Sequence, residues 1–305
     1  MSGERKRPIY IDCDPGLDDA VAIALAACAP ELEIAALSVV AGNAALGRTL
    51  DNALSVTAAL GLKVPVHAGA DRPLRVKPQL GTEIWGGNGS LNPKRPRRSA
   101  SPESAADALV RIMKNAPDHS LLLCCLGPLT NLATVLQREP ALSAKIDRLL
   151  LMGGARGNGN VTTAAEFNIW FDPHAAKRVF DADLNTVVVP YDLTRTVMIG
   201  APHIQMLSQS NAPEAQLSAR MLAMAGSEGH PSAVHDALVI ACLLWPDLFS
   251  FERGRITVCI EDGPARGQTR FSPGEGRHIL LTSVDQDKLL DLMVTRLAGN
   301  TKRQK

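Results

Sequence analysis

The stretch IYIDCDPGLDDA at residues 9–20 decides the fold of this chain. Its apolar start predicts a short strand, its Pro-Gly pair predicts a turn, and the apolar residues that continue to position 25 predict a helix. Four carboxylates fall within eight residues at the point where strand becomes helix: Asp12, Asp14, Asp18 and Asp19. This crowding of acids at one turn is the first sign of a functional site.

Four neighbouring acids repel one another unless something compensates their charge. Two such charges about 4 Å apart repel by roughly 4 kcal/mol at an effective dielectric constant of about 20. A helix N-terminus offsets only about 0.3–1 kcal/mol per anion. Taken singly, Asp18 or Asp19 could be an ordinary first-turn acid, and Asp12 could cap the helix or face solvent. Together, the four acids indicate a hard divalent cation with oxygen ligands, or protonation of several of them.

The bulk composition is that of one large α/β domain. The chain has 305 residues, 46% of them hydrophobic, and a formal net charge of +1, which argues against a disordered chain and gives no general reason to expect a nucleic-acid partner. The six cysteines form no C-x-x-C pair and read as reduced thiols of a cytoplasmic protein. Residues 1–7 lack the apolar core of a signal peptide, and no apolar run is long enough to cross a membrane.

Strand-like and helix-like runs alternate along the chain. This pattern predicts an open, mostly parallel central β-sheet with helices on both faces, in one domain over 1–305 with a core at about 8–298. After the first strand and helix, we expect strands at 33–40, 64–67, 120–126, 146–152, 186–189, 255–261, 267–271 and 277–282. Helices are expected at 46–60, 103–115, 131 onward, 172–181, 203–225 (two), 234–245 and 284–298.

The segment 71–102 is rich in Pro, Gly and Arg and predicts an irregular loop. Thirty such residues are more than a connection usually needs, which favours a functional flap. Its basic cluster at 94–98 is typical of a solvated loop. Trp85 lies in this segment and could stack on an aromatic ligand or pin the loop to the core.

Polar groups or glycines follow several of the predicted strands. Asp14, Asn43, Leu126-Gly127 and Met152-Gly153 each come just after an apolar run. In open α/β sheets, ligands bind outside the C-terminal ends of the strands. Segments far apart in the sequence are therefore expected to converge on one crevice.

Two further groups of polar residues lie in the second half of the chain. The loop at 157–168 carries Asn160, Glu166 and Asn168, whose amides and carboxylate suit a hydroxyl-rich ligand, although Asn and Gly are also ordinary turn residues. His235-Asp236 opens an apolar helix. Asp236 could be its N-cap or a further cation ligand, and His235 a chance neighbour or a proton donor.

Together these motifs resemble one family. Residues 12–20 (DCDPGLDDA) resemble the D-x-D-P-G-x-D-D-A signature of the inosine–uridine-type nucleoside hydrolases, and the resemblance extends over residues 8 to 298. The other matching segments are Gly42-Asn43, 127–131, 152–155, 165–168, Asp172-Pro173 and His235-Asp236. The resemblance implies an open α/β fold, Ca²⁺-dependent cleavage of ribonucleosides to free base and ribose, a role in purine or pyrimidine salvage, and a homodimer or homotetramer.

The resemblance also assigns roles to single residues. It implies Ca²⁺ ligands at Asp14, Asp19, Asp236 and the backbone carbonyl of Leu126, with Asp14 also the general base for the attacking water. It implies ribose contacts from Asp18, Asn43 and Asn168, a grip on the 5′-hydroxyl from Asn160 and Glu166, Met152 beneath the ribose, and assistance to the departing base from His235.

The sequence departs from the family pattern around the base. Trp85 stands where many members have a histidine, and His235 stands where a purine-selective branch has a tryptophan. The segment 221–234 lacks the aromatic residues of some pyrimidine-preferring members. The sequence therefore does not select the preferred base, and the candidate substrates include a non-standard nucleoside.

Two other functions fit parts of the sequence. Asp12-x-Asp14 resembles the D-x-D motif of Mg²⁺-dependent phosphohydrolases, but Pro15-Gly16 follows it and no phosphate-gripping lysine motif appears. A non-catalytic ribose- or nucleoside-binding protein would keep the site without turnover. The complete set of aspartates, together with His235, argues against a protein that has lost its catalytic activity.

Overall fold

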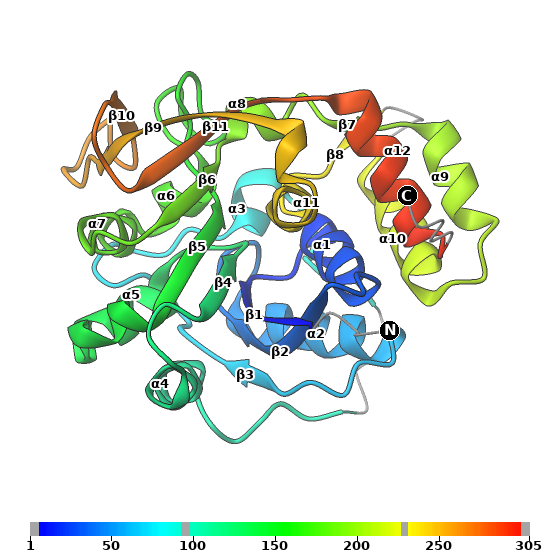
Figure 1. Cartoon of the computed structure of the whole chain (residues 1–305), viewed down its shortest axis with the longest axis horizontal. Coiled ribbons are helices and arrows are strands. Elements are labelled where there is room, and N and C mark those ends of the chain that lie inside the picture. The colour runs from blue at the N-terminus through cyan, green and yellow to red at the C-terminus, as the bar shows by residue number, and fades with distance from the viewer. Residues whose placement is uncertain (1–5, 93–97, 227–230, 300–305) are drawn as a thin grey trace.

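The computed structural model describes residues 6–92, 98–226 and 231–299. Within these ranges the chain builds a nine-stranded sheet in the order β10-β9-β11-β6-β5-β4-β1-β2-β3 (Figure 1). Its strands are β1 (Arg7–Cys13), β2 (Leu32–Val39), β3 (Val66–Ala68), β4 (Leu121–Cys125), β5 (Ile146–Met152), β6 (Thr186–Val189), β9 (Phe249–Val258), β10 (Thr269–Pro273) and β11 (His278–Val284). Among these strands, β9 alone runs opposite to the others, antiparallel to β10 and β11, so the predicted, mostly parallel sheet is confirmed.

Helices cover both faces of this sheet. One face carries α1 (Leu17–Ala27), α2 (Leu46–Ala59), α9 (Ala201–Ser208), α10 (Pro213–Ala225), α11 (Ala237–Leu244) and α12 (Gln286–Leu297). The other carries α4 (Ala105–Asn115), α5 (Thr130–Arg138) and α7 (Pro173–Asp181). The short elements are α3 (Gly81–Trp85), η1 (Pro140–Lys145), α6 (Phe167–Phe171), α8 (Tyr191–Thr194), η2 (Pro246–Leu248) and the antiparallel pair β7 (Met198–Ile199) and β8 (Ser232–Ala233).

The helix that follows the acidic turn lies at the centre of the molecule. Every residue of α1 from Asp19 to Ala26 is buried. A helix that is apolar all round must be covered on all sides, and α1 packs against α10, α11 and α12 (Figure 1). Its start is thereby fixed in space, which fixes the acids that it carries.

The chain reverses direction across the sheet beside β1. It passes from β1 outward to β2 and β3, and then returns to place β4 on the other side of β1. The C-terminal ends of β1 and β4 therefore flank the topological switch point, where open α/β sheets bind ligands.

The structure differs from the sequence prediction in several places, and it includes the unpredicted short elements α6, α8, β7 and β8. The segment 71–102 is not wholly irregular, because it contains α3; its residues 93–97 lie outside the described ranges. Arg98, the described end of the basic cluster, is not simply solvated, since its guanidinium donates to the carbonyls of Leu62 (2.7 Å) and Val64 (2.8 Å). Strand β9 begins six residues before the predicted start. The prediction missed its first half because the polar run at 252–255 separates Phe249 and Phe251 from the apolar residues that follow.

No helix in the described part of the chain is both long and apolar enough to cross a membrane.

Candidate active site

A cleft of about 630 Å³ opens at the C-terminal ends of β1, β4 and β5. Ten of the side chains predicted to form the site line it, together with Leu126: Asp14, Asp18, Asn43, Trp85, Met152, Asn160, Glu166, Asn168, His235 and Asp236. Asp19, the remaining predicted ligand, lies fully buried at the start of α1. Segments separated by more than 200 residues thus converge on one crevice, as the strand-end argument predicts.

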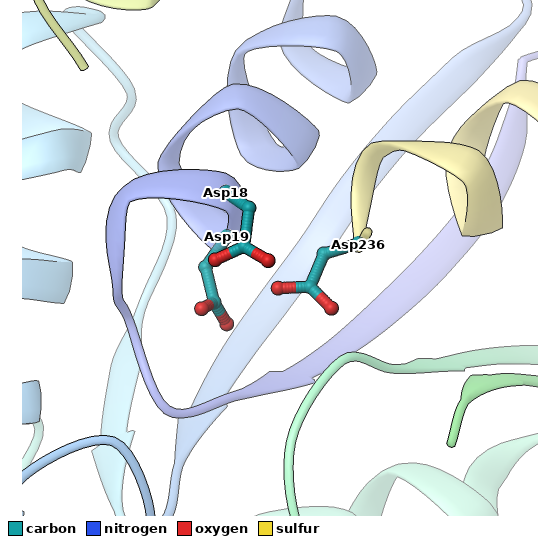
Figure 2. A group of neighbouring side chains, drawn as sticks. All are labelled: Asp18, Asp19 and Asp236. Atoms are coloured by element: carbon teal, nitrogen blue, oxygen red, sulfur yellow. The ribbon is translucent and has the colours of Figure 1, made fainter. Parts of the chain in front are cut away.

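Three carboxylates meet at one end of the cleft. Asp18, Asp19 and Asp236 offer oxygen atoms that all lie within 4.8 Å of one another. Figure 2 shows Asp18 and Asp19 projecting from the first turn of α1 toward Asp236, which precedes α11. The pair β7–β8 and the burial of α11 bring Asp236 here, since β8 ends three residues before it.

Asp19 also holds the acidic turn in shape. Its carboxylate accepts hydrogen bonds from the backbone N–H groups of Gly16 (2.9 Å) and Asp14 (3.2 Å). It therefore acts as a first-turn helix acid and, at the same time, belongs to the acidic cluster. The two roles that the sequence left open for this residue coexist.

Asp14 lies in a cradle that leaves no space for other side chains. Its Oδ2 accepts the backbone N–H of Asn43 at 2.7 Å. A Cβ added at Gly42 or Gly127 would lie 2.2 or 2.3 Å from a carboxylate oxygen of Asp14. Both glycines are therefore required where they stand, because any side chain there would displace the Asp14 carboxylate.

Burial makes the charges of these acids costly. It raises the pKa of Asp14 and of Asp236 well above the ordinary range, and raises the pKa of Asp19 to about 7, with neighbouring acids adding to each shift. No lysine or arginine of the described chain forms an ion pair with them. A cluster of oxygen donors with uncompensated negative charge fits a hard divalent cation.

Asp12 does not belong to this cluster. It lies on the opposite face of β1 from Ile11 and Cys13, buried, and accepts hydrogen bonds from Ser38 and from Asn131 (2.8 Å). The four acids of residues 12–19 are therefore not one group, because Asp12 is held inside the sheet by Ser38 and Asn131, whereas Asp14 lies beyond the last residue of β1, where the alternation of a strand no longer applies. Nor does Asp12 cap the helix or face solvent. A carboxylate buried in this way is also unsuited to the nucleophilic role of a D-x-D phosphohydrolase.

The loop at 157–168 lies across the cleft and is held by its own polar groups. Glu166 caps α6 by accepting the backbone N–H of Asn168 (2.9 Å), and its other carboxylate oxygen accepts the backbone N–H of Gly154 (2.9 Å). The amide nitrogen of Asn168 donates to the carbonyls of Leu126 (2.8 Å) and Met152 (3.1 Å). Asn160 accepts the backbone N–H of Phe167 at 2.9 Å. These bonds fix side chains that also face the cleft.

Glu166 gives a pH-dependent contribution to stability. Burial raises its pKa to about 7, from 4.5 in the unfolded chain. Between these values the folded state holds the proton that the unfolded state has lost, so stability falls as pH rises, by up to about 3 kcal/mol. We expect Glu166→Gln to remove this slope. Urea unfolding of both proteins at pH 5 and pH 7.5 measures it; parallel pH profiles would contradict the assignment.

His235 and Trp85 both line the cleft. Burial lowers the pKa of His235, and Asp18 opposes that shift. The Trp85 ring contacts Phe167, with centroids 4.9 Å apart, and yet stays 52% exposed. Trp85 therefore both anchors α3 to α6 and leaves a face open toward a ligand, so the two readings of its role are compatible.

Some cleft residues were not predicted. Tyr191 follows β6, so the strand-end rule applied to that strand would have found it. Met221 and Met224 lie three residues apart on α10 and both line the cleft, but an amphipathic helix carries no signal that distinguishes a ligand-facing methionine from a core one.

Known proteins share this fold and these motifs. Residues 9–291 match the family model of the inosine-uridine preferring nucleoside hydrolases. The pyrimidine-specific ribonucleoside hydrolase RihA of Klebsiella pneumoniae is 34% identical over 308 residues, covering 95% of this chain and 98% of the relative. Among solved structures, the plant nucleoside hydrolase PpNRh1 matches with a TM-score of 0.86 at 27% identity, covering 97% of this chain and 100% of that one. A purine-preferring ribonucleoside hydrolase from Gardnerella vaginalis also matches with a TM-score of 0.86, at 26% identity, covering 96% and 98%.

The family match spans nearly the whole chain, and the conserved fold places its motifs around one acidic cleft. The chain therefore belongs to the inosine-uridine preferring nucleoside hydrolase family.

Proposed function

We propose that this nucleoside hydrolase cleaves the N-glycosidic bond of a ribonucleoside to free base and ribose with the help of bound Ca²⁺. The observation that carries the proposal is the cluster of the half-buried Asp18 with the buried Asp19 and Asp236 beside Asp14, with no paired basic residue in the described chain. Asp14, Asp19, Asp236 and the carbonyl of Leu126 would hold the ion. Ca²⁺ suits such a site because it accepts six to eight oxygen ligands, which leaves positions for ribose hydroxyls and water.

Asp14 would act as the general base. Bound Ca²⁺ supplies a water of lowered pKa. The Asn43 N–H fixes one oxygen of the Asp14 carboxylate at 2.7 Å, and the other, which lies beside Gly127, accepts no hydrogen bond from a side chain of the described residues. Asp14 is thus oriented to accept the proton of the attacking water.

The sugar would lie between the acids and the 157–168 loop. All six side chains line the cleft: Asp18, Asn43 and Asn168 would contact the diol of the ribose, Met152 would lie beneath the ring, and Asn160 and Glu166 would contact the 5′-hydroxyl. The buried carboxylates would stabilise the oxocarbenium-like charge that develops as the glycosidic bond breaks.

The base would lie against the aromatic and apolar side chains that line the cleft, which include Trp85, Tyr191, Met221 and Met224. We propose that Trp85 stacks on the base and that His235 assists its departure. The relatives do not select one base, since RihA is named pyrimidine-specific and the Gardnerella vaginalis enzyme purine-preferring.

Release of free ribose from a panel of purine, pyrimidine and modified nucleosides tests the function. We expect turnover of at least one class when Ca²⁺ is present. Absence of turnover across the panel, together with calorimetric binding of ribose, would instead identify a non-catalytic binding protein. Release of phosphate from sugar phosphates would identify a phosphohydrolase.

The family resemblance further supports a salvage role in the cytoplasm and a homodimer or homotetramer. Light scattering of the purified chain measures the oligomeric state; a monomer would exclude both assemblies.

A further inference from the structure

The imidazole of His235 is held from two sides by the single turn of α8. The Oγ1 atom of Thr194 lies 2.7 Å from Nδ1 of His235. The ring of Tyr191 lies against the imidazole, with centroids 5.6 Å apart and planes inclined by 32°. Because residues i and i+3 share one face of a helix, this turn presents a hydrogen bond to the edge of the imidazole and an aromatic ring to its face.

The turn that holds the histidine is itself firmly held. Thr194 is fully buried, and the backbone N–H of Tyr191 donates to the carbonyl of Gly154 at 2.8 Å. The carboxylate of Asp192 accepts the backbone N–H groups of Arg156 (2.5 Å) and Gly157 (3.0 Å). The cradle therefore exists before any ligand enters the cleft.

The contact with Thr194 leaves one nitrogen of His235 for the ligand. The Thr194 hydroxyl lies 2.7 Å from Nδ1 and 3.3 Å from the carbonyl of Tyr191, and it can donate its one proton to either acceptor. When it donates across the shorter contact, Nδ1 is the acceptor and the proton of the neutral imidazole lies on Nε2. In the described chain, Nε2 has no hydrogen-bond partner, and His235 lines the cleft. Whichever way the proton lies in the Thr194 contact, Nδ1 is used by the protein and Nε2 is not.

We propose that Thr194, supported by Tyr191, is a positioning residue that presents Nε2 of His235 to the leaving base. The inference rests on the proposed function. As the C–N bond breaks, its electron pair stays on the base and the proton of Nε2 passes to a base nitrogen. The water oxygen bonds to the anomeric carbon and gives its proton to Asp14; exchange with solvent then restores both groups.

The test compares two leaving groups. A nucleoside base needs the proton, whereas the nitrophenolate of p-nitrophenyl β-D-ribofuranoside departs as a stable anion. We expect Thr194→Val to lower kcat on nucleosides by about 10–100-fold, part of the 10²–10⁴-fold that general acid catalysis supplies, with less than about a twofold change on the nitrophenyl riboside. Thr194→Ser, which keeps the hydroxyl, should restore most of the nucleoside rate.

Thr196→Val is the matched control. Its hydroxyl donates to the carbonyl of Leu193 at 2.7 Å and does not touch His235, so it should change neither rate. Should Thr194→Val fail to fold, Thr194→Ala also removes the hydroxyl that contacts Nδ1 of His235, and should show the same selective loss.

Three outcomes are decisive. Equal losses on both substrates, or no loss on either, would overturn the positioning role while leaving the proposed function intact. Failure of the wild-type enzyme on nucleosides would overturn the proposed function itself, and with it this inference. A selective loss on nucleosides that Thr194→Ser reverses would support the assignment, because a merely structural defect would affect both substrates.

Discussion

Replacing Asp14 with alanine should lower kcat on the best nucleoside by at least about 10³-fold. The change removes both the general base and one proposed Ca²⁺ ligand, and a positioned base alone contributes about 10²–10⁴-fold. The Asn43 N–H that now fixes Asp14 would lose its acceptor but lies next to the cleft, where water can replace it.

The fold should survive this substitution. Burial raises the pKa of Asp14 well above its ordinary range, which means that its charge costs stability in the metal-free protein. We therefore expect the metal-free Asp14→Ala protein to unfold within a few degrees of the wild type, as measured by circular dichroism.

A second buried aspartate provides the control for Asp14→Ala. Asp12→Asn changes an acid two residues away that accepts from Asn131 and does not line the cleft, so we expect turnover within about tenfold of the wild type. If Asp14→Ala kept more than a tenth of the wild-type rate, Asp14 would have no place in the mechanism.

Removal of divalent metal should abolish turnover and lower the melting temperature, and Ca²⁺ should restore both. A ligand at 100 times its dissociation constant stabilises the folded state by about 2.7 kcal/mol, and each kcal/mol shifts the melting temperature of a domain this large by roughly 2–4 °C. The expected rise on adding Ca²⁺ is thus roughly 5–10 °C. Because burial and repulsion keep protons on the metal-free acids, binding should also release protons.

Scanning calorimetry of the chelated and reloaded protein measures this effect. Asp236→Asn should lose the rise, since it removes one charged ligand from the cluster. Mg²⁺ at equal concentration should restore less, because it demands six close ligands and keeps its waters. Full activity in the chelated protein, with no shift on reloading, would refute the metal site.

Much of the site follows from local sequence. The sequence predicted one shared crevice for four residues, because each lies at or just beyond the end of a strand and parallel strands end at one edge of a sheet. These residues are Asp14, Asn43, Leu126 and Met152. The strands at 146–152 and 186–189 match those observed, because both are short buried runs with clear ends.

Other features could not be read in this way. The helix α3 within 71–102 has only five residues, too few to show the apolar periodicity of a helix. It is held by the packing of Trp85 on Phe167, which lies more than 80 residues away in the sequence. The first half of β9 is largely exposed, and its pairing with β11, rather than a buried apolar pattern, holds it as a strand. In both cases long-range contacts decide the local structure.

The sequence by itself determined which chemical groups this protein brings to its ligand and at which edge of the sheet they gather, because strand ends and turn motifs are local features. Only the tertiary structure decided how the acids divide: Asp12 turns into the core toward Asn131, while Asp18 and Asp19 meet Asp236 from the far end of the chain. It also decided that the Thr194 hydroxyl forms a hydrogen bond with Nδ1 of His235. These choices depend on side-chain direction and on packing between distant segments, which the spacing of residues along a chain does not encode.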